Sequence, residues 1–173
     1  NAITIECNDV TIDLMGYTLN GRDSGSTSGV YMFGSANVEI RNGTVRNFGL
    51  YGIEAIISGG KGHRVIGVRA LANGYTGIFL GGNSHLVKDC TAVGNGHYGI
   101  FADDGSTVTG NTCHNNYWNG IEAHYGSTVT GNTCHNNYWN GIEAHYGSTV
   151  TGNTCYNNSD NGIYAYYGST VTG

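Results

Sequence analysis

Residues 110–130 read GNTCHNNYWNGIEAHYGSTVT, and residues 131–151 repeat them without a single change. A third copy with substitutions begins at Gly152, and a looser copy occupies residues 89–109. The C-terminal half of the sequence therefore has a period of 21 residues. Self-similarity at a period of 20–50 residues indicates a repeat architecture, in which each unit packs on its neighbours.

Within one repeat, apolar and polar residues alternate over short runs. Ile121 and Ala123 share one face of the GIEAHYG segment, and Glu122 and His124 share the other face. This alternation is typical of strands. We expect three short strands per repeat, over residues 120–125, 128–130 and 133–136, with corners built from Gly and Asn.

A unit of this size cannot bury its own inner face, so we expect the units to stack as coils with parallel strands about 4.8 Å apart. Three apolar columns support this stacking. The first contains Val30, Ile53, Ile78, Ile100, Ile121, Ile142 and Ile163; the second contains Ile40, Val65, Val87, Val108, Val129, Val150 and Val171; the third contains Val45, Ala70, Ala92, Cys113, Cys134 and Cys155.

These columns predict an all-β solenoid of about seven to eight coils, forming a single domain over residues 1–173. Residues 1–88 form irregular coils with loop insertions at residues 21–28 and 58–63, and residues 89–173 form the regular 21-residue coils. The five cysteines are an odd number, which does not fit a closed disulfide framework. We expect Cys113, Cys134 and Cys155 to stack as small buried thiols.

Charged residues are few and unevenly placed. Only 11% of the residues are charged, the net charge is −5, and all seven Lys and Arg lie in the first 88 residues. Residues 89–173 carry six acids and no Lys or Arg, which argues against a nucleic-acid partner because phosphates need a basic surface. No run of about 18 apolar residues is present to span a membrane. No signal peptide is visible, and we expect both ends to be cut from a longer chain.

The opening segment ITIECNDVTIDLMGYTLNG and the later coils of the form V-x-G-N-T…N-N…N-G-I resemble the pectate-lyase-like superfamily. The resemblance covers the whole chain and implies a right-handed parallel β-helix. It also implies an internal asparagine ladder through Asn111, Asn132 and Asn153, and a secreted or cell-surface protein whose partner is a polysaccharide or other glycan.

Members of this superfamily usually bind glycans on the outward face of the first strand and on the corner before it. Alternation places there a column of Tyr31, Glu54, Phe79, Phe101, Glu122, Glu143 and Tyr164, and a second column of Phe33, Ile56, Gly81, Asp103, His124, His145 and Tyr166. The corner adds Tyr75, Tyr98, Trp118 and Trp139. We predict that the residues binding substrate are Tyr98, Phe101, Trp118, Trp139 and Tyr164. The alternative is that these aromatic residues only pair from coil to coil, as good strand formers do.

Acidic and histidine side chains on the same face are candidate catalytic residues. The predicted set is Asp103, Asp104, Glu122, His124, Glu143 and His145. Like charges this close raise the pKa of one carboxylate, which makes a general acid near neutral pH. Paired carboxylates serve glycoside hydrolysis, and an acid with Tyr and His can abstract a sugar ring proton.

Signatures of three enzyme groups are incomplete in this sequence. Asp103-Asp104 with His124 is similar in placement to polygalacturonase-like hydrolases, but their Gly-His-Gly, Asn-Thr-Asp and Arg-Ile-Lys elements are missing. Residues 119–124 (NGIEAH) resemble the Tyr-Gly-x-Asp-Pro-His motif of mannuronan epimerases in spacing. Pectate lyases need a basic residue near bound calcium, and residues 89–173 offer none.

Glu122, His124, Glu143 and His145 also supply nitrogen and oxygen ligands that suit zinc or copper. The alternative is a set of solvated histidine ladders, of which His114 and His135 would form another. We predict no resident cofactor or metal, and the sequence leaves calcium or a His/Glu-bound metal open.

Packing alone would not keep surface Glu, His, Tyr and Trp identical in two adjacent coils. The identity therefore indicates copying, by recent duplication or by deliberate insertion of a coil. The sequence is consistent with two hypotheses for the function. The first is a glycan-binding protein, with polysaccharide processing of lyase, hydrolase or epimerase type. The second is a structural solenoid without catalysis, which associates end to end through its bare strand edges.

Overall fold

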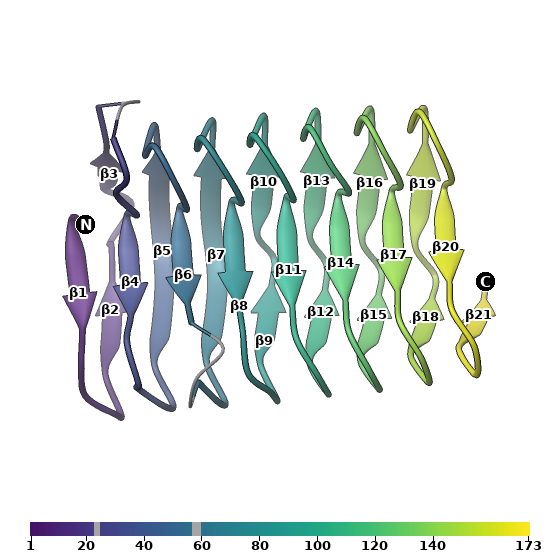
Figure 1. The fold of residues 1–173 in the computed structure, drawn as a ribbon, viewed down its shortest axis with the longest axis horizontal. Coiled ribbons are helices and arrows are strands. Elements are labelled where there is room, and N and C mark those ends of the chain that lie inside the picture. Colours follow the sequence, from purple (N-terminus) through teal and green to yellow (C-terminus); the bar gives the residue numbers. More distant parts are fainter. Residues whose placement is uncertain (23–24, 57–59) are drawn as a thin grey trace.

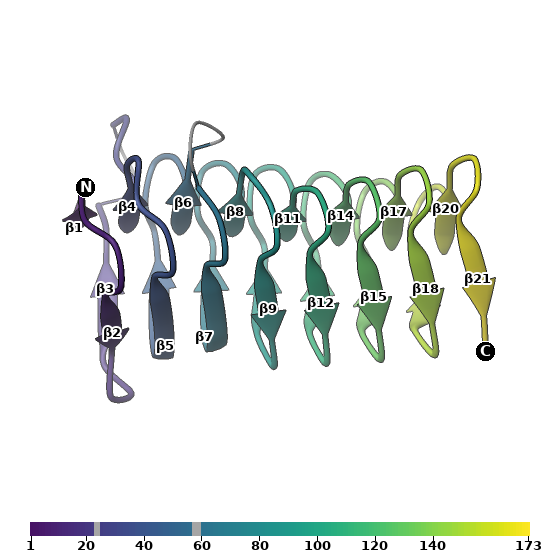
Figure 2. The same cartoon turned by 90° about the horizontal axis from the view of Figure 1, so that it is seen from below.

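The computed structural model describes residues 1–22, 25–56 and 60–173, and its regular structure consists of strands. The chain winds into successive turns along one long axis, with its two termini at opposite ends (Figures 1 and 2). Among the described residues, no helix is long and apolar enough to cross a membrane. The two predicted loop insertions lie partly outside the described residues.

One sheet contains eight parallel strands, which occupy the front of Figure 1. In spatial order they are β1 (Ile3–Ile5), β4 (Val30–Met32), β6 (Ile53–Ala55), β8 (Ile78–Leu80), β11 (Ile100–Ala102), β14 (Ile121–Ala123), β17 (Ile142–Ala144) and β20 (Ile163–Ala165).

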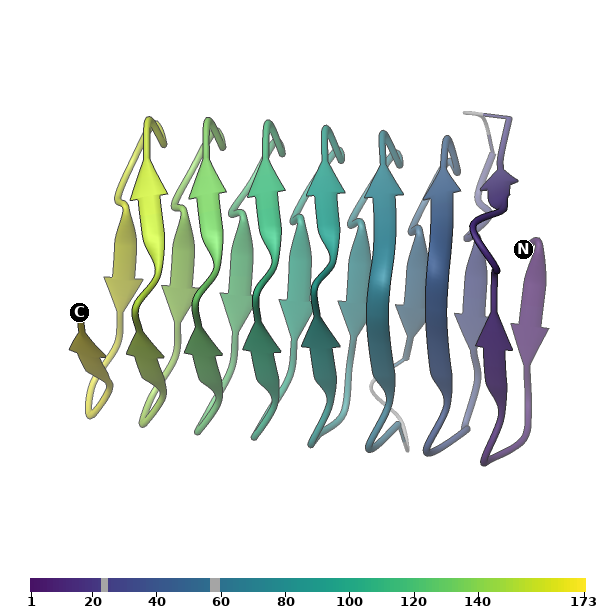
Figure 3. The ribbon, with the colours of Figure 1, turned by 180° about the vertical axis from the view of Figure 1, so that it is seen from behind.

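The second sheet contains 13 strands and faces the viewer in Figure 3. Its strands are β2 (Thr11–Asp13), β3 (Thr18–Asn20), β5 (Glu39–Arg46), β7 (Arg64–Leu71), β9 (Leu86–Lys88), β10 (Thr91–Val93), β12 (Thr107–Thr109), β13 (Thr112–His114), β15 (Thr128–Thr130), β16 (Thr133–His135), β18 (Thr149–Thr151), β19 (Thr154–Tyr156) and β21 (Thr170–Thr172). Three short strands per coil, as predicted, are found from β8 onward.

Two earlier coils differ, because β5 and β7 are continuous strands of eight residues. In these coils Gly43 pairs with Val68 through the backbone. In the later coils the corresponding position is Cys90 or an asparagine, and its N–H donates to the Oδ1 of the next asparagine instead of to a backbone carbonyl. The asparagine ladder therefore divides one long strand into two short ones.

The three predicted apolar columns are confirmed by the strand register and by burial. Ile121 pairs with Ile142, Val129 with Val150, and Cys113 with Cys134, each directly over its counterpart in the next coil. All six of these side chains are fully buried. The cysteines are free thiols, as expected.

Asparagine side chains form the predicted ladder inside one corner. The Nδ2 of Asn111 donates to the Oδ1 of Asn132 at 2.9 Å, and the Nδ2 of Asn132 donates to the Oδ1 of Asn153 at 3.0 Å. A second ladder was not predicted; it runs through Asn73, Asn95, Asn116, Asn137 and Asn158. Both ladders satisfy backbone groups that the tight corners leave without a strand partner.

A third ladder begins with two histidines and continues with serines. The backbone N–H of Val38 donates to Nδ1 of His63, the N–H of His63 donates to Nδ1 of His85, and the N–H of His85 donates to Oγ of Ser106. Burial lowers the pKa of His63 and of His85 to about 4. Protonation of either ring would also place a proton on Nδ1, which could then no longer accept the backbone hydrogen bond.

This histidine pair predicts acid sensitivity of the fold. Between pH 6.5 and about 4 the unfolded chain binds more protons than the folded chain, so stability falls as the pH is lowered through this interval. Each histidine contributes up to about 1.4 kcal/mol per pH unit. Urea unfolding at several pH values measures the effect. The variant His63→Ser with His85→Ser, which uses the residue found at this position from Ser106 onward, should show a flatter profile; an equally steep one would contradict the assignment.

The inward position of Ile142 predicts that Ile142→Asp prevents folding. The change places an unpaired carboxylate in the fully buried column, which should cost more than about 4 kcal/mol. Thr149→Asp, on the exposed side of the next strand, serves as the control and should change stability by less than about 0.5 kcal/mol. Circular dichroism during denaturation distinguishes them, and equal midpoints would show that the column is not the core.

Candidate functional site

The outward side chains of the eight-stranded sheet lie in register, as the alternation predicted. Phe79 pairs with Phe101, Phe101 with Glu122, Glu122 with Glu143, and Glu143 with Tyr164. The pairing places the two glutamates side by side on β14 and β17. The predicted candidates thus share one face of the coil stack, although this arrangement alone assigns no function to them.

Aromatic rings stack in the corner before these strands. The ring centroids of Tyr75, His97, Trp118 and Trp139 follow one another at 4.3, 5.2 and 4.5 Å. His97, which was not predicted, occupies the place in this stack that was predicted for Tyr98. Counting back from the aligned glycines would have found it, because His97 and Trp118 each stand two residues before the glycine.

Tyr98 instead occupies the position of Asn119 in the following coil, as the backbone bonds of the adjacent glycines show. Its side chain lies close enough to Glu122 to lower the pKa of that carboxyl. Burial, together with the charge of Glu122, raises the pKa of Tyr98 well above its ordinary value. Tyr98 is therefore protonated at neutral pH, and its partly buried ring is not an exposed surface for a ligand.

Asparagine amides hold both glutamates. The Nδ2 of Asn119 donates to Oε2 of Glu122 at 3.1 Å and to Oε2 of Glu143 at 2.8 Å. The Nδ2 of Asn140 donates to the same Glu143 oxygen at 3.0 Å. Neither asparagine was predicted as a functional residue, although both recur at one repeat position and precede the glycine of the first strand.

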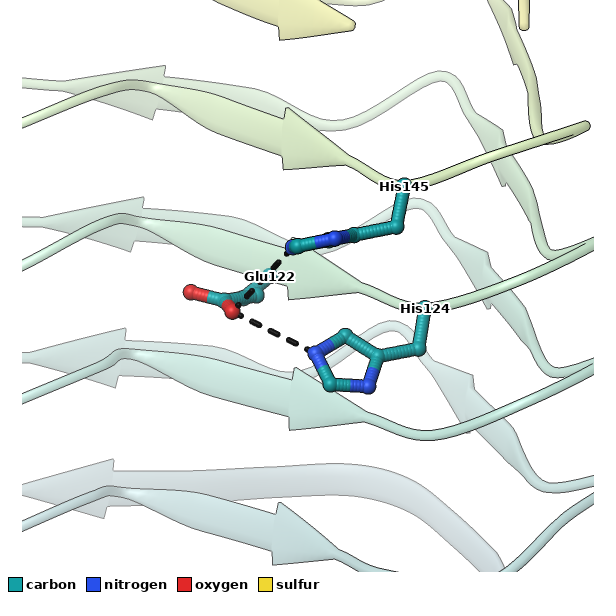
Figure 4. Close-up of side chains that lie close together, drawn as sticks. All are labelled: Glu122, His124 and His145. Atoms are coloured by element: carbon teal, nitrogen blue, oxygen red, sulfur yellow. Dashed lines mark hydrogen bonds and ion pairs between the residues drawn. The ribbon is translucent and has the colours of Figure 1, made fainter. Parts of the chain in front are cut away.

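His124 and His145 approach Glu122 from the same side (Figure 4). The Nε2 atoms of both rings lie 3.4 Å from Oε1 of Glu122. The opposite nitrogen of His124, Nδ1, lies 3.0 Å from Oδ1 of Asp103. The structure thus brings together four predicted residues, Asp103, Glu122, His124 and His145, and places Glu143 at 3.7 Å from His145.

The expected general acid at the glutamate pair is not found at Glu122. Burial would raise the pKa of Glu122, but hydrogen bonds from His124, Tyr98 and Asn119 lower it below the ordinary value. The argument from like charges did not name the carboxylate whose pKa rises, and these three donors prevent a rise at Glu122. Burial and the neighbouring Asp103 raise the pKa of Asp104, which is exposed. Glu122 is therefore ionised at neutral pH.

His124 responds to the same carboxylates. Burial would lower the pKa of His124, but its hydrogen bonds and charge interactions with Glu122 and Asp103 raise it. His124 joins the two carboxylates into one connected group across two coils.

An open cleft of about 330 Å³ lies next to this group. Its lining residues are Trp139, Asn140, Glu143, Asp160, Asn161, Tyr164 and Tyr166. Trp139 and Tyr164, both predicted to bind substrate, are 39% and 44% exposed. Phe101, also predicted to bind substrate, is only 7% exposed, so little of its ring is accessible to a ligand. Trp118 is covered on both sides by His97 and Trp139.

The chain matches the family model described as right handed beta helix region over residues 2–130 and again over residues 28–173. It therefore belongs to this family of right-handed β-helix proteins, and the predicted superfamily and handedness are confirmed.

Two solved structures from Azotobacter vinelandii are similar to the chain. The A-module of the mannuronan C-5 epimerase AlgE4 has a TM-score of 0.76 and 17% identity, over 98% of this chain and 56% of that chain. The A-module of the mannuronan C-5 epimerase AlgE6 has a TM-score of 0.63 and 17% identity, over 90% of this chain and 60% of that chain. The chain thus spans less than two thirds of either protein, and the likeness shows the fold. No curated protein sequence matches it.

The role of Asn119 leads to a prediction about stability. Asn119→Ala removes an amide donor from two carboxylates and leaves the N–H of Asn140 without its acceptor, which should cost about 2–3 kcal/mol. The matched control is Asn161→Ala, whose amide donates only to Asn140 and is exposed. Urea denaturation should show a much larger loss for Asn119→Ala. Equal losses would mean that the glutamates do not depend on the amide.

Proposed function

We propose that the protein binds a neutral polysaccharide in the cleft between Trp139, Glu143, Asp160 and Tyr164. The observation that carries this proposal is the end of the aromatic stack. Trp139 is the last ring, because the next coil places Asp160 where the two earlier coils have tryptophan. One face of the Trp139 ring therefore borders open space instead of another ring.

The residues around that ring have the chemistry that a sugar requires. An exposed aromatic face suits the apolar face of a sugar ring, and an exposed aromatic patch on a protein surface often marks a binding site. Glu143 and Asp160 supply carboxylate oxygens, and Asn161 supplies an amide, so hydroxyl groups find acceptors and a donor in the same cleft. A few directed polar groups beside aromatic walls are typical of small-molecule sites.

The acidic side chains around the cleft favour an uncharged glycan over an anionic one. Residues 89–173 contain six acids and no Lys or Arg. A polyuronate would bring its carboxylates against Glu143 and Asp160, and these coils contain no Lys or Arg to offset the repulsion. The proposed ligand is therefore an uncharged polysaccharide, and an extracellular polysaccharide of this kind agrees with the expected secreted or cell-surface location.

The catalytic roles of Asp103, Asp104, Glu122, His124, Glu143 and His145 stay predictions. Tyr98, which interacts with Glu122, supplies a tyrosine near the epimerase-like segment at residues 119–124, which has none. A uronate carboxylate, however, would find no basic Lys or Arg in the sequence of these coils. Binding of a neutral glycan is therefore the function that the cleft supports best.

Binding is tested by calorimetric titration with neutral β-glucan, xylan and mannan oligosaccharides, with oligomannuronate and oligogalacturonate as the charged set. A neutral oligosaccharide should bind, and Trp139→Ala should weaken it at least about tenfold, because truncation of a central aromatic residue commonly costs more than about 1.4 kcal/mol. Tyr156→Ala is the matched control, since Tyr156 is similarly exposed in the following coil but belongs to the second sheet.

Three outcomes would contradict the proposal. They are tighter binding of the charged set, unchanged binding by Trp139→Ala, and no binding to any sugar. The last outcome would favour the alternative of a structural solenoid. Ultraviolet absorbance of unsaturated products, followed on the two uronate oligomers, reports lyase activity in the same samples.

A further inference from the structure

We propose that Glu122, His124 and His145 form a binding site for a divalent transition-metal ion, and that zinc is the ion this set of donors suits best. The inference does not depend on the proposed binding of a glycan. Two imidazole nitrogens and one carboxylate oxygen are a ligand set that zinc accepts in proteins, with a fourth position left open.

The distances among the donor atoms fit one ion. Oε1 of Glu122 lies 3.4 Å from Nε2 of His124 and 3.4 Å from Nε2 of His145 (Figure 4). All three donor atoms lie within 4.8 Å of one another. With tetrahedral bonds of about 2.0–2.2 Å, neighbouring ligand atoms are about 3.3–3.6 Å apart. A small rotation of the rings therefore brings all three donors into bonding range of a central ion.

One donor atom of this cluster is buried without a partner. Among the described residues, Nε2 of His145 is inaccessible to solvent and has no hydrogen bond. Its 3.4 Å approach to Glu122 is an ion-pair distance that lacks the alignment of a hydrogen bond. A buried nitrogen without a hydrogen-bond partner requires an explanation, and a role as a metal ligand supplies one.

The surrounding residues orient the ligands as the shell around a metal does. Nδ1 of His124 faces the carboxylate of Asp103 at 3.0 Å, and Asp103 in turn accepts the backbone N–H of Gly82 at 3.0 Å. This partner orients the ring so that Nε2 of His124 faces Glu122, as carboxylates do for metal-binding histidines. Asn119 holds Oε2 of Glu122, which leaves Oε1 facing the rings. The His145 ring stacks on Tyr166 at 4.6 Å.

The electrostatic surroundings favour a cation. Glu122 is only 7% exposed, and an ionised carboxylate at that burial gains from a neighbouring positive charge. Asp103 and Glu143 add negative charge on either side. The second group of potential ligands, Asp103, Asp104 and His124, offers one imidazole and an exposed carboxylate, so it supports the first group instead of competing for zinc.

The ligands come from the two identical coils, and only their junction supplies two histidines. Residues 110–130 provide Glu122 and His124, and residues 131–151 provide His145. The coil before them has Phe101 and Asp103 at the corresponding positions, and the coil after them has Tyr164 and Tyr166. One ion per chain follows from this arrangement.

The test is calorimetric titration of chelator-treated protein with Zn²⁺, with Co²⁺ absorption as a probe of the coordinating atoms. One Zn²⁺ should bind per chain, and the melting temperature should rise with Zn²⁺ concentration because the ion binds only the folded site. Glu122→Gln and His145→Gln should each abolish the binding. Asp103→Asn, which leaves all three ligands in place and changes the partner of His124, should weaken it about 10- to 100-fold.

The control is His114→Gln with His135→Gln. These two rings also stack, with centroids 4.7 Å apart, but they lie on β13 and β16 of the other sheet. This variant should bind Zn²⁺ as the parent does. The inference is overturned if the parent binds no Zn²⁺ at millimolar concentration, if Glu122→Gln and His145→Gln still bind, or if the control loses binding. Circular dichroism shows that each variant is folded, and binding of neutral sugars is scored separately.

Discussion

Parallel backbone pairing between successive coils is the constraint on which this structure depends. In the regular half of the chain the pairing joins each residue to the residue 21 positions later, as Ile121 with Ile142 and Cys113 with Cys134. Each side chain therefore lies beside an identical side chain of the next coil, unless one of the two positions has been substituted. Columns of one residue type are favourable for isoleucine, valine and cysteine, which fill the interior, and unfavourable for ionised glutamate.

Asparagine amides stabilise the glutamate column that this pairing produces. Asn119 donates to both Glu122 and Glu143, so one side chain satisfies two carboxylates that the register forces together. Its ladder also runs in the opposite direction to the other two asparagine ladders, since the N–H of Asn140 donates back to Oδ1 of Asn119. Reversal leaves the amide hydrogens of Asn119 free to face the glutamates. The polar chemistry of the outer face thus rests on the same stacking that builds the core.

Much of this arrangement was predictable, because residues at equivalent positions of successive repeats lie next to one another in the stack. The Ile, Val and Cys columns, the Asn111 ladder and the outward position of Glu122 all follow from alternation and a constant period. Corner residues were harder to predict, because their alignment between coils depends on their distance from the next glycine. His97, and not Tyr98, therefore belongs to the aromatic stack. The lowered pKa of Glu122 could not be derived from the sequence, since it depends on three donors that converge from two coils. The burial of Phe101 depends likewise on its packed neighbours.

The identical coils have a consequence for how such a chain evolves. A duplicated unit ordinarily doubles what it already contains, but the pairing of His124 with His145 exists in neither copy alone. It is a property of the boundary between copies, so a run of n identical coils holds n − 1 such boundaries. A single duplication therefore creates a new chemical arrangement in one step, without any substitution. Further copying would add boundaries one at a time, at equal spacing along the axis, and loss of one copy would erase the arrangement entirely.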